Sequence, residues 1–241
     1  MEANKIIITG AATRIGAAIA KSLSGPDVEI VIHYNSSKTK AEKLKRELIK
    51  NHTKVFLIKG DLSKEKDLNK IIKFSKSKLR YFDCLINNAS LFENDNLRNF
   101  TSQSWAKHLD VNLKAPAYLT KEFAKNTKGK NNNIINIIDQ RVFKLTPFFF
   151  SYTLSKTGLY TLTKTSAMSL APNIRVNGIA PGPTIKNKRQ TDNHFKKQYL
   201  ATPLRQQVNV MEICNAVAVS YTHLRAHETE ADLVCRLLLE K

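Results

Sequence analysis

The sequence predicts an α/β protein in which helices cover both faces of a doubly wound parallel sheet. Short apolar runs alternate with longer amphipathic segments, the pattern that strand–helix–strand units require. The apolar runs are rich in Ile and Val, as expected for strands that are buried on both faces. A chain of 241 residues with 42% hydrophobic residues suffices for one core. We therefore expect a single domain over residues 1–218.

The individual elements follow from this alternation. The expected strands are Lys5–Thr9, Glu29–His33, Lys54–Ile58, Cys84–Asn87, Asn133–Ile138 and Ile174–Ile179. The expected helices between them are Arg14–Leu23, Ser37–Asn51, Ser63–Ser77, Ser102–Lys125 and Ser151–Leu170. Right-handed crossovers between successive strands would place all six strands parallel in one sheet. A further helix is expected near Val208–Val217, after a basic segment running from Thr184 to about Leu204.

The turn after the first strand, "TGAATRIG", has the features of a dinucleotide-binding turn of Rossmann type. Gly10 follows the strand directly, where it permits a tight turn, and Gly16 opens the next helix, where it permits close packing. The N-terminus of that helix would offer backbone amides to a phosphate. The spacing departs from G-x-G-x-x-G, so the turn alone does not distinguish a cofactor site from an ordinary strand-to-helix turn.

The end of the second strand favours NADP(H) over NAD(H). In NAD-binding units an acidic residue at this point binds the ribose 2′-hydroxyl. This chain has Asn35, Ser36, Ser37 and Lys38 instead, and all of them can donate hydrogen bonds to a 2′-phosphate. Ser36 or Ser37 could equally cap the following helix, and the two functions are compatible.

Tyr152 and Lys156 form a candidate proton-transfer pair. They lie four residues apart on an expected helix and therefore on one face of it. An ammonium group beside a phenol is expected to lower the phenol's pKa, which suits proton transfer near neutral pH. Asp139 is a second candidate, because it ends the apolar run "NIINII", where a carboxylate costs desolvation energy unless a function needs it.

Together, "TGAATRIG", "GDLS", "INNAS", "DVN", "SYTLSK" and "IRVNGIAPGP" resemble the short-chain dehydrogenase/reductase family over roughly residues 4–218. The resemblance implies that Tyr152 is the proton donor and that Lys156 binds the nicotinamide ribose and lowers the tyrosine pKa. It also implies that Asn112 kinks a helix and positions a relay water. The cofactor-binding residues implied are Gly10, Arg14, Ile15, Gly16, His33, Tyr34, Asn35, Ser36, Ser37, Asp61, Leu62, Asn88, Ala89, Tyr152, Lys156, Pro181, Gly182 and Thr184.

Asp139 stands where the family normally has a catalytic serine. Within the family this replacement is typical of the pteridine reductase group, in which an acid can bind or protonate a ring nitrogen. That resemblance implies substrate contacts from Arg14, Ser90, Phe92, Asp139 and Tyr152, with the Phe92 ring stacking on the pterin. From the residues alone, Asp139 could also cap the next segment or pair with Arg141, Phe92 could pack on the core, and Arg14 could be an ordinary surface residue.

The expected function is therefore NADPH-dependent reduction of a dihydropterin or dihydrofolate. A carbonyl reductase acting on 3-oxoacyl thioesters is the enzymatic alternative, and a non-catalytic NADP- or nucleic-acid-binding protein is the second. The net charge of +19 is compatible with nucleic acid, but its lysines are scattered rather than clustered with Arg and aromatic residues, so we expect no such partner. We also expect no metal site and no membrane span, and a cytoplasmic location.

The end of the chain departs from the family pattern. No glycine follows Gly182, and the segment "VSYTHLRAHETEADLVCRLLLEK" resembles translated sequencing-adapter read-through. We interpret residues 219–241 as a non-native tail, with the last strand of the family's sheet missing or replaced. His223 and His227 are spaced like a metal-binding pair on a helix, but we expect no site there. With a native-like C-terminus the resemblance implies a homotetramer.

Overall fold

The computed structural model of the chain describes residues 4–129, 132–187 and 190–222. They form one six-stranded sheet in the order β3-β2-β1-β4-β5-β6, in which every pairing is parallel. The strands are β1 (Asn4–Ile8), β2 (Val28–Tyr34), β3 (Lys54–Lys59), β4 (Cys84–Asn87), β5 (Asn132–Ile137) and β6 (Ile174–Ile179). All six lie within one residue of the strands expected from the sequence, which confirms the doubly wound α/β fold.

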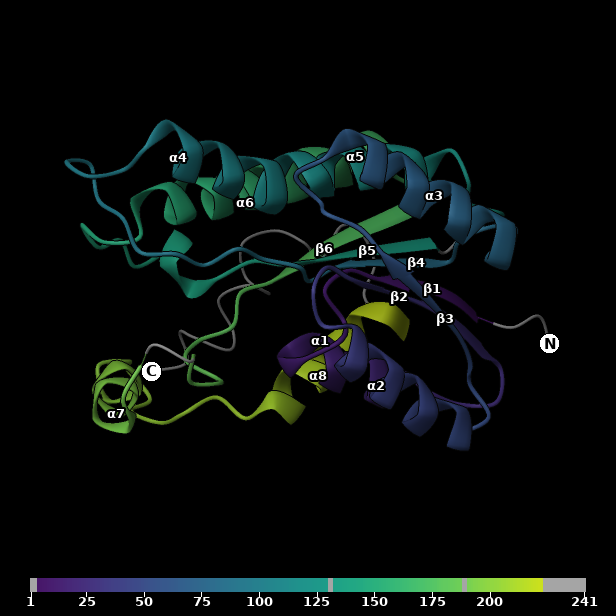
Figure 1. The fold of residues 1–241 in the computed structure, drawn as a ribbon, viewed down its shortest axis with the longest axis horizontal. Helices are drawn as coiled ribbons and strands as arrows, with labels where there is room; N and C mark the ends of the chain where they lie inside the picture. Colours follow the sequence, from purple (N-terminus) through teal and green to yellow (C-terminus); the bar gives the residue numbers. More distant parts are fainter. Residues whose placement is uncertain (1–3, 130–131, 188–189, 223–241) are drawn as a thin grey trace.

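The helices cover the sheet on both faces (Figure 1). They are α1 (Arg14–Ser22), α2 (Lys38–Lys50), α3 (Glu65–Leu79), α4 (Ser102–Leu109), α5 (Ala115–Ala124), α6 (Phe150–Leu170), α7 (Asp192–Leu200) and α8 (Val210–Thr222). Helices α1, α2 and α8 lie on one face, and α3, α4, α5 and α6 lie on the other. Helix α7 stands apart from both layers, at the left of Figure 1.

Alternating side chains of each strand supply the two halves of the core. On β1, Ile6 and Ile8 pack in the cluster that contains residues of α1, α2 and α8, while Ile7 packs in the cluster that contains residues of α3 and α5. All three are at most 1% exposed. Because both faces of the strand are buried, the sequence reads as a continuous apolar run rather than as an alternation.

The segment expected as one helix over Ser102–Lys125 contains an irregular turn. Helix α4 passes into a π-helical turn, Asp110–Lys114, before α5 begins at Ala115. Single π turns within α-helices often occur at functional sites. Asn112 lies in this turn and is fully buried.

The strand order places a crevice at the C-terminal ends of β1 and β4. The chain winds outward from β1 through β2 to β3 and then crosses to β4, so the connections after β1 and β4 diverge. Parallel open sheets bind their ligands at such a reversal. None of the helices that the structure describes has the length and apolarity to span a bilayer.

Candidate active site

A cleft of about 730 Å³ opens at this reversal. Its walls contain nearly all of the residues singled out in the sequence: Gly10, Arg14, Ile15, Gly16, His33, Tyr34, Asn35, Ser36, Ser37, Asp61, Leu62, Asn88, Ala89, Ser90, Phe92, Asp139, Tyr152, Lys156, Pro181, Gly182 and Thr184. Asn112 and Lys38 are the exceptions: the Asn112 side chain lies behind the wall and is fully buried, and Lys38, at the start of α2, does not line the cleft. The fold thus brings these positions together, while their individual roles stay predictions.

The glycines of the first turn leave room for a phosphate-binding loop. Gly10 has φ +62°, and a Cβ there would lie 2.8 Å from the Cα of Ala89. A Cβ on Gly16 would collide with the Asn88 side chain and lie 2.7 Å from the Gly10 carbonyl oxygen. Asn88 in turn donates from Nδ2 to the carbonyl oxygens of Thr9 (2.9 Å) and Gly10 (3.2 Å). A larger residue at either glycine would force this turn or the neighbouring Asn88–Ala89 segment to move.

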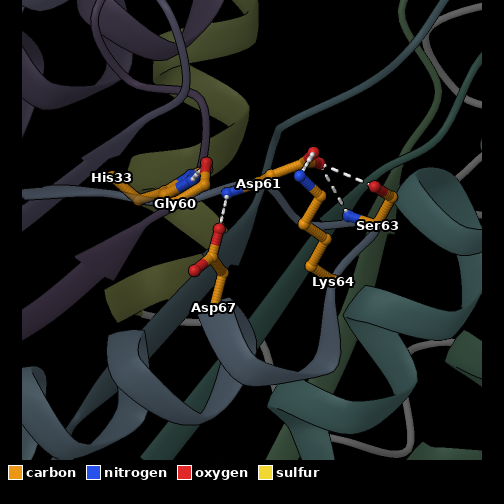
Figure 2. Close-up of polar contacts among 6 residues, drawn as sticks. All are labelled: His33, Gly60, Asp61, Ser63, Lys64 and Asp67. Carbon is orange, nitrogen blue, oxygen red and sulfur yellow. Dashed lines mark hydrogen bonds and ion pairs between the residues drawn. The ribbon is translucent and has the colours of Figure 1, made fainter.

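His33 supports the same turn from β2. Its Nδ1 accepts from the Gly10 backbone N–H at 3.2 Å, and its Nε2 lies 3.0 Å from the Gly60 carbonyl oxygen (Figure 2). These partners require a neutral ring with the proton on Nε2. Burial lowers the pKa of His33, which favours the neutral form. His33 is thus a structural support as well as a wall residue.

The segment after β3 forms one side of the same region. Asp61 accepts at Oδ1 from the backbone and hydroxyl of Ser63 (3.1 and 2.8 Å), and its own N–H donates to Asp67 at 2.8 Å (Figure 2). Lys64 Nζ lies 3.6 Å from Asp61 Oδ2. Hydrogen bonds from Ser63, aided by Lys64, hold the pKa of Asp61 below its ordinary value despite opposing desolvation. Its carboxylate is therefore charged where it lines the cleft.

The end of β2 presents the polar residues expected to select the cofactor. Asn35 and Ser36 are exposed, and Ser37 occupies the N-cap position of α2. The Ser37 side chain makes no capping hydrogen bond. The capping alternative is therefore not realised for Ser37, and its hydroxyl stays able to bind a ligand.

Asp139 and Tyr152 are in direct contact. The Tyr152 hydroxyl donates to Asp139 Oδ2 at 2.6 Å, while Asp139 Oδ1 accepts from the Arg141 backbone N–H at 2.9 Å. Asp139 therefore caps the short turn Gln140–Val142 and also faces the tyrosine. The capping alternative raised by the sequence is correct, and it does not exclude a role in proton transfer.

Lys156 lies at the base of the cleft, and only 2% of it is exposed. Its Nζ donates to the Ile137 carbonyl oxygen at 2.8 Å and lies 5.9 Å from the centroid of the Tyr152 ring. Burial lowers the Lys156 pKa to about 8. A cation this accessible to deprotonation near neutral pH suits a proton relay.

The expectation that Lys156 lowers the Tyr152 pKa is wrong in this structure. Burial, together with the adjacent Asp139 carboxylate, raises the Tyr152 pKa well above its ordinary value. The reason is geometric: the carboxylate accepts the phenolic proton at hydrogen-bond distance, whereas the ammonium is directed toward the Ile137 carbonyl. Tyr152 is thus held as a protonated donor.

Asn112 stabilises the wall of the cleft from behind. Its Oδ1 accepts from the Leu91 N–H at 2.8 Å and from the Ser90 hydroxyl at 3.3 Å. Its Nδ2 donates to the Leu91 carbonyl at 2.9 Å and to Ser155 Oγ at 3.0 Å. The side chain thus joins the segment after β4 to α6, and its expected role in positioning a water stays a prediction.

Phe92 belongs to an aromatic cluster beside Tyr152. It stacks on Phe149, with ring centroids 4.4 Å apart and planes 3° apart, and meets the Tyr152 ring edge-on at 4.6 Å. The Arg141 guanidinium lies 4.4 Å from the centroid of Phe149. Phe149 therefore supports a ring that lines the cleft. The sequence reading missed Phe149, although "FFF" directly before Ser151 was a visible signal.

The segment after β6 forms the opposite wall. The Arg14 guanidinium donates to the carbonyl oxygens of Ile185 (2.7 Å) and Lys186 (2.9 Å), which ties this segment to the first turn. Further wall residues that were not singled out are Leu91, Gln140 and Lys144, and the basic segment from Thr184 to about Leu204 contributes Asn187, Gln190, Phe195 and Gln198. Residues 188 and 189, part of the basic stretch, lie outside the described residues, as do His223 and His227.

The residues around the cleft suit a nicotinamide cofactor. The space beside Gly10 and Gly16, the neutral His33 and the polar end of β2 together fit a dinucleotide phosphate. Among the described residues, no group of three or more His, Cys, Asp or Glu side chains is placed to bind a metal ion.

Comparison with known proteins agrees with this geometry. Residues 4–197 match the family described as short chain dehydrogenase. The structure of FolM alternative dihydrofolate reductase 1 from Brucella canis, complexed with NADP, is 36% identical, with a TM-score of 0.87 over 94% of this chain and 91% of that one. The Brucella suis protein of the same description, also with NADP, is 34% identical, with a TM-score of 0.87 over 92% and 91%.

Curated relatives carry a different description. A 3-oxoacyl-[acyl-carrier-protein] reductase from Synechocystis is 29% identical over 76% of this chain and 74% of its own length. The enzyme FabG from Staphylococcus epidermidis, described by the same activity, is 29% identical over 88% of both chains. The neighbours thus agree on a reductase fold and differ in their substrates.

Proposed function

The chain belongs to the short-chain dehydrogenase family and is an NADP-dependent oxidoreductase, and from that premise we propose that it reduces the C=N bond of a dihydropterin or dihydrofolate. The observation that carries the proposal is the Asp139 carboxylate, 2.6 Å from the Tyr152 hydroxyl at the end of β5. A carboxylate suits a substrate that presents ring N–H groups and a basic ring nitrogen. A ketone offers only an acceptor oxygen, which a carboxylate would repel.

NADPH supplies a hydride when it is bound. The residues that would hold it are the first turn at Gly10 and Gly16, Asn35 to Ser37 at the end of β2, and the wall at Asn88. Within the chain, Tyr152 would give its hydroxyl proton to the substrate nitrogen, and its raised pKa keeps it protonated until then. The buried Lys156 ammonium would return a proton to the phenolate, and the Asp139 carboxylate would again accept the hydrogen bond of the restored hydroxyl.

Phe92 would orient the flat substrate. Its ring lines the cleft beside Tyr152 and is supported by Phe149. Stacking on a fixed ring restricts a planar heterocycle to one plane, and such orientation can lower the barrier by several kcal/mol, on the order of 5. Ser90, on the same wall, would contact the substrate edge.

The two FolM-described structures support this substrate class, since they exceed the curated relatives in identity. Reduction of a 3-oxoacyl thioester is the second candidate, and the two curated reductases at 29% identity favour it. In that case Asp139 would act only as the cap of the turn Gln140–Val142.

The deciding experiment measures NADPH consumption with dihydropterins, dihydrofolate and acetoacetyl thioester side by side, in the wild type and in Asp139→Ser. We expect pterin turnover to exceed thioester turnover. The variant should keep its NADPH affinity and lose pterin turnover by about tenfold or more, the scale of removing one proton-transfer group. Thioester turnover alone, or unchanged pterin turnover in the variant, would refute the proposal.

We further propose a cytoplasmic location, no nucleic-acid partner and, for a chain with a native-like C-terminus, a homotetramer. The family resemblance supports the tetramer, and the scattered lysines argue against a nucleic-acid surface. Light scattering of the purified chain tests the assembly, and retention on a DNA column at physiological salt tests the partner.

A further inference from the structure

A buried polar cluster lies next to the cleft but outside its walls. Asp95, His108 and Ser151 come from the segment after β4, from α4 and from the first turn of α6. Their exposures are 5%, 0% and 0%. Ser151 Oγ donates to Asp95 Oδ2 and lies 2.7 Å from His108 Nδ1. Burying polar groups costs free energy unless they form hydrogen bonds, so these three side chains must bond to one another or to the backbone.

The hydrogen bonds determine where the protons lie. His108 Nε2 faces the Glu93 backbone N–H at 3.2 Å, so this nitrogen must be an acceptor. The proton of the neutral ring is then on Nδ1, where it faces the Ser104 carbonyl oxygen at 3.0 Å and Ser151 Oγ. The Ser151 hydroxyl accepts a hydrogen bond from the ring and donates one to Asp95, so the hydrogen bonds run in one direction from His108 through Ser151 to Asp95.

Asp95 also caps α6. Its carbonyl oxygen accepts from the Phe150 N–H at 3.2 Å, and its Oδ1 accepts from the Ser151 N–H at 3.1 Å. Asn94 Oδ1 accepts from the Phe149 N–H at 3.3 Å. The first turn of a helix has unpaired N–H groups and a partial positive charge, which explains how a carboxylate is stable here when all of its hydrogen-bond donors are neutral groups.

This cluster resembles a hydrolytic triad in composition only. Ser151 is not part of the cleft wall, is fully buried, and commits its proton to a carboxylate rather than to an imidazole. A nucleophilic serine needs access to a substrate and a base that takes its proton. The cluster therefore has no means of nucleophilic attack.

Its position points to a different role. The segment 90–95 carries Phe92 and is held at three points: Leu91 by Asn112, Glu93 by His108, and Asp95 by Ser151. Ser151 directly precedes Tyr152 on α6. We propose that Asp95, Ser151 and His108 form a positioning relay that fixes Phe92 relative to Tyr152 and so sets where the substrate lies, an inference that rests on the proposed function for the identity of that substrate.

Ser151→Ala is the primary test, because it removes the central hydroxyl and little volume. Thr153→Val is a matched control: Thr153 is also buried on α6, and its hydroxyl has no hydrogen-bond partner among the described residues. Asp95→Asn is the second variant, since it keeps the shape but puts a donor where Ser151 needs an acceptor. The measurements are amide hydrogen exchange of residues 90–95, KM and kcat for the dihydropterin, and NADPH affinity.

We expect Ser151→Ala and Asp95→Asn to exchange faster over residues 90–95, to raise KM for the dihydropterin and to lower kcat/KM by about tenfold or more. NADPH affinity should stay within about twofold of the wild type, because the Gly10 turn is not part of the relay. Thr153→Val should match the wild type in all three. Two results would overturn the relay. One is that Ser151→Ala and Thr153→Val have the same exchange rates and the same KM. The other is that Ser151→Ala loses NADPH affinity by the same factor as it loses kcat/KM for the dihydropterin. A wild type without pterin turnover refutes the proposed function, and the exchange result still decides the relay.

Discussion

Lys156 brings an ammonium group into the interior of the protein, and no carboxylate of the described residues lies at hydrogen-bond distance from it. Its Nζ donates to the Ile137 carbonyl oxygen, and burial lowers its pKa from an ordinary 10.5 to about 8. Desolvation is the main cause, and the charge of Asp139 opposes it only in part. At neutral pH the chain thus keeps a costly charge at the point where the proposed proton relay needs one.

A pH-dependent contribution to stability follows. Because the folded-state pKa of Lys156 is lowered, the unfolded chain binds a proton that the folded chain has lost between pH about 8 and 10.5, and stability rises with pH in that window. We expect the wild type to gain about 2 kcal/mol of unfolding free energy relative to Lys156→Met between pH 7 and 9.5. Urea unfolding across this range measures the difference.

The exposed Lys164 on the same helix provides the control. Lys164→Met should unfold with the same pH dependence as the wild type. A constant difference between wild type and Lys156→Met at all pH values would mean that Lys156 titrates as an exposed lysine does.

The position of a single site residue could be predicted where that residue lies at a defined point of a strand or helix. Asp139 follows β5 and Tyr152 lies near the start of α6, so their meeting in the cleft could be expected. The direction in which the Tyr152 pKa is shifted could not be expected, because it depends on whether the phenol faces the carboxylate or the ammonium. Asp95 and His108 were missed because both are isolated polar residues in the sequence, and only tertiary contacts pair them with Ser151.

At the scale of elements, the π turn between α4 and α5 is the feature that most directly shapes the wall of the cleft. It places Asn112 under the segment after β4, where the side chain makes four hydrogen bonds. A regular helix would rotate this residue away from Leu91 and Ser155. The helix is thus irregular at the point where an amide connects two walls of the site.

Asn112→Ala should therefore cost both stability and activity. Leu91 would lose both of its hydrogen bonds to Asn112, and the buried Ser155 hydroxyl would lose a donor, so we expect the unfolding free energy to fall by about 2–4 kcal/mol. Thr120→Val on α5 is the control, since the Thr120 hydroxyl is buried and has no hydrogen-bond partner among the described residues. It should change stability by about 0.5 kcal/mol or less. Urea unfolding of both variants checks this, and similar losses would show that Asn112 is not the support described here.

The strands were predicted to within one residue, because runs such as "KIIIT" and "NIINII" are buried on both faces and bounded by polar residues. The helices were placed nearly as well. The π turn was not resolved as such, since its hydrogen-bond register leaves no mark on the hydrophobic pattern. The sequence did not place helix α7, which lies within the basic segment, because its apolar positions are few and Phe195 is its only buried residue.

At the scale of the whole molecule, β6 is an edge strand in the sheet that the described residues form. Helix α8 crosses beside it and packs on β5 and β6 through polar groups. Ser220 accepts from Asn133, Asn177 and Arg175, and the Tyr221 carbonyl accepts from Arg175 at 2.8 Å. The sequence predicted that a non-native tail begins at residue 219, yet Val219–Thr222 continue this helix. The boundary between residues 218 and 219 stays a prediction.

Two truncations test that boundary. A chain ending at Thr222 keeps the acceptors at Ser220 and Tyr221, whereas one ending at Ala218 leaves Asn133 and Asn177 buried without them. Each lost hydrogen bond with a buried group left unpaired costs about 1–3 kcal/mol. Since 1 kcal/mol lowers Tm by about 2–4 °C in a domain of this size, we expect the shorter chain to melt roughly 5–10 °C below the longer one.

Thermal unfolding of both truncations and of the full chain, each with and without NADPH, measures this. We expect the chain ending at Thr222 to melt with the full-length protein and to keep its NADPH affinity, because the C-terminal end of α8 contacts Asn133 and Arg175 near the start of β5 and β6, whereas the cofactor turn follows the end of β1. Equal melting of the two truncations would place the end of the folded domain at residue 218. A large loss on ending at Thr222 would mean that residues 223–241 contribute to the fold, and would refute the interpretation of them as a non-native tail.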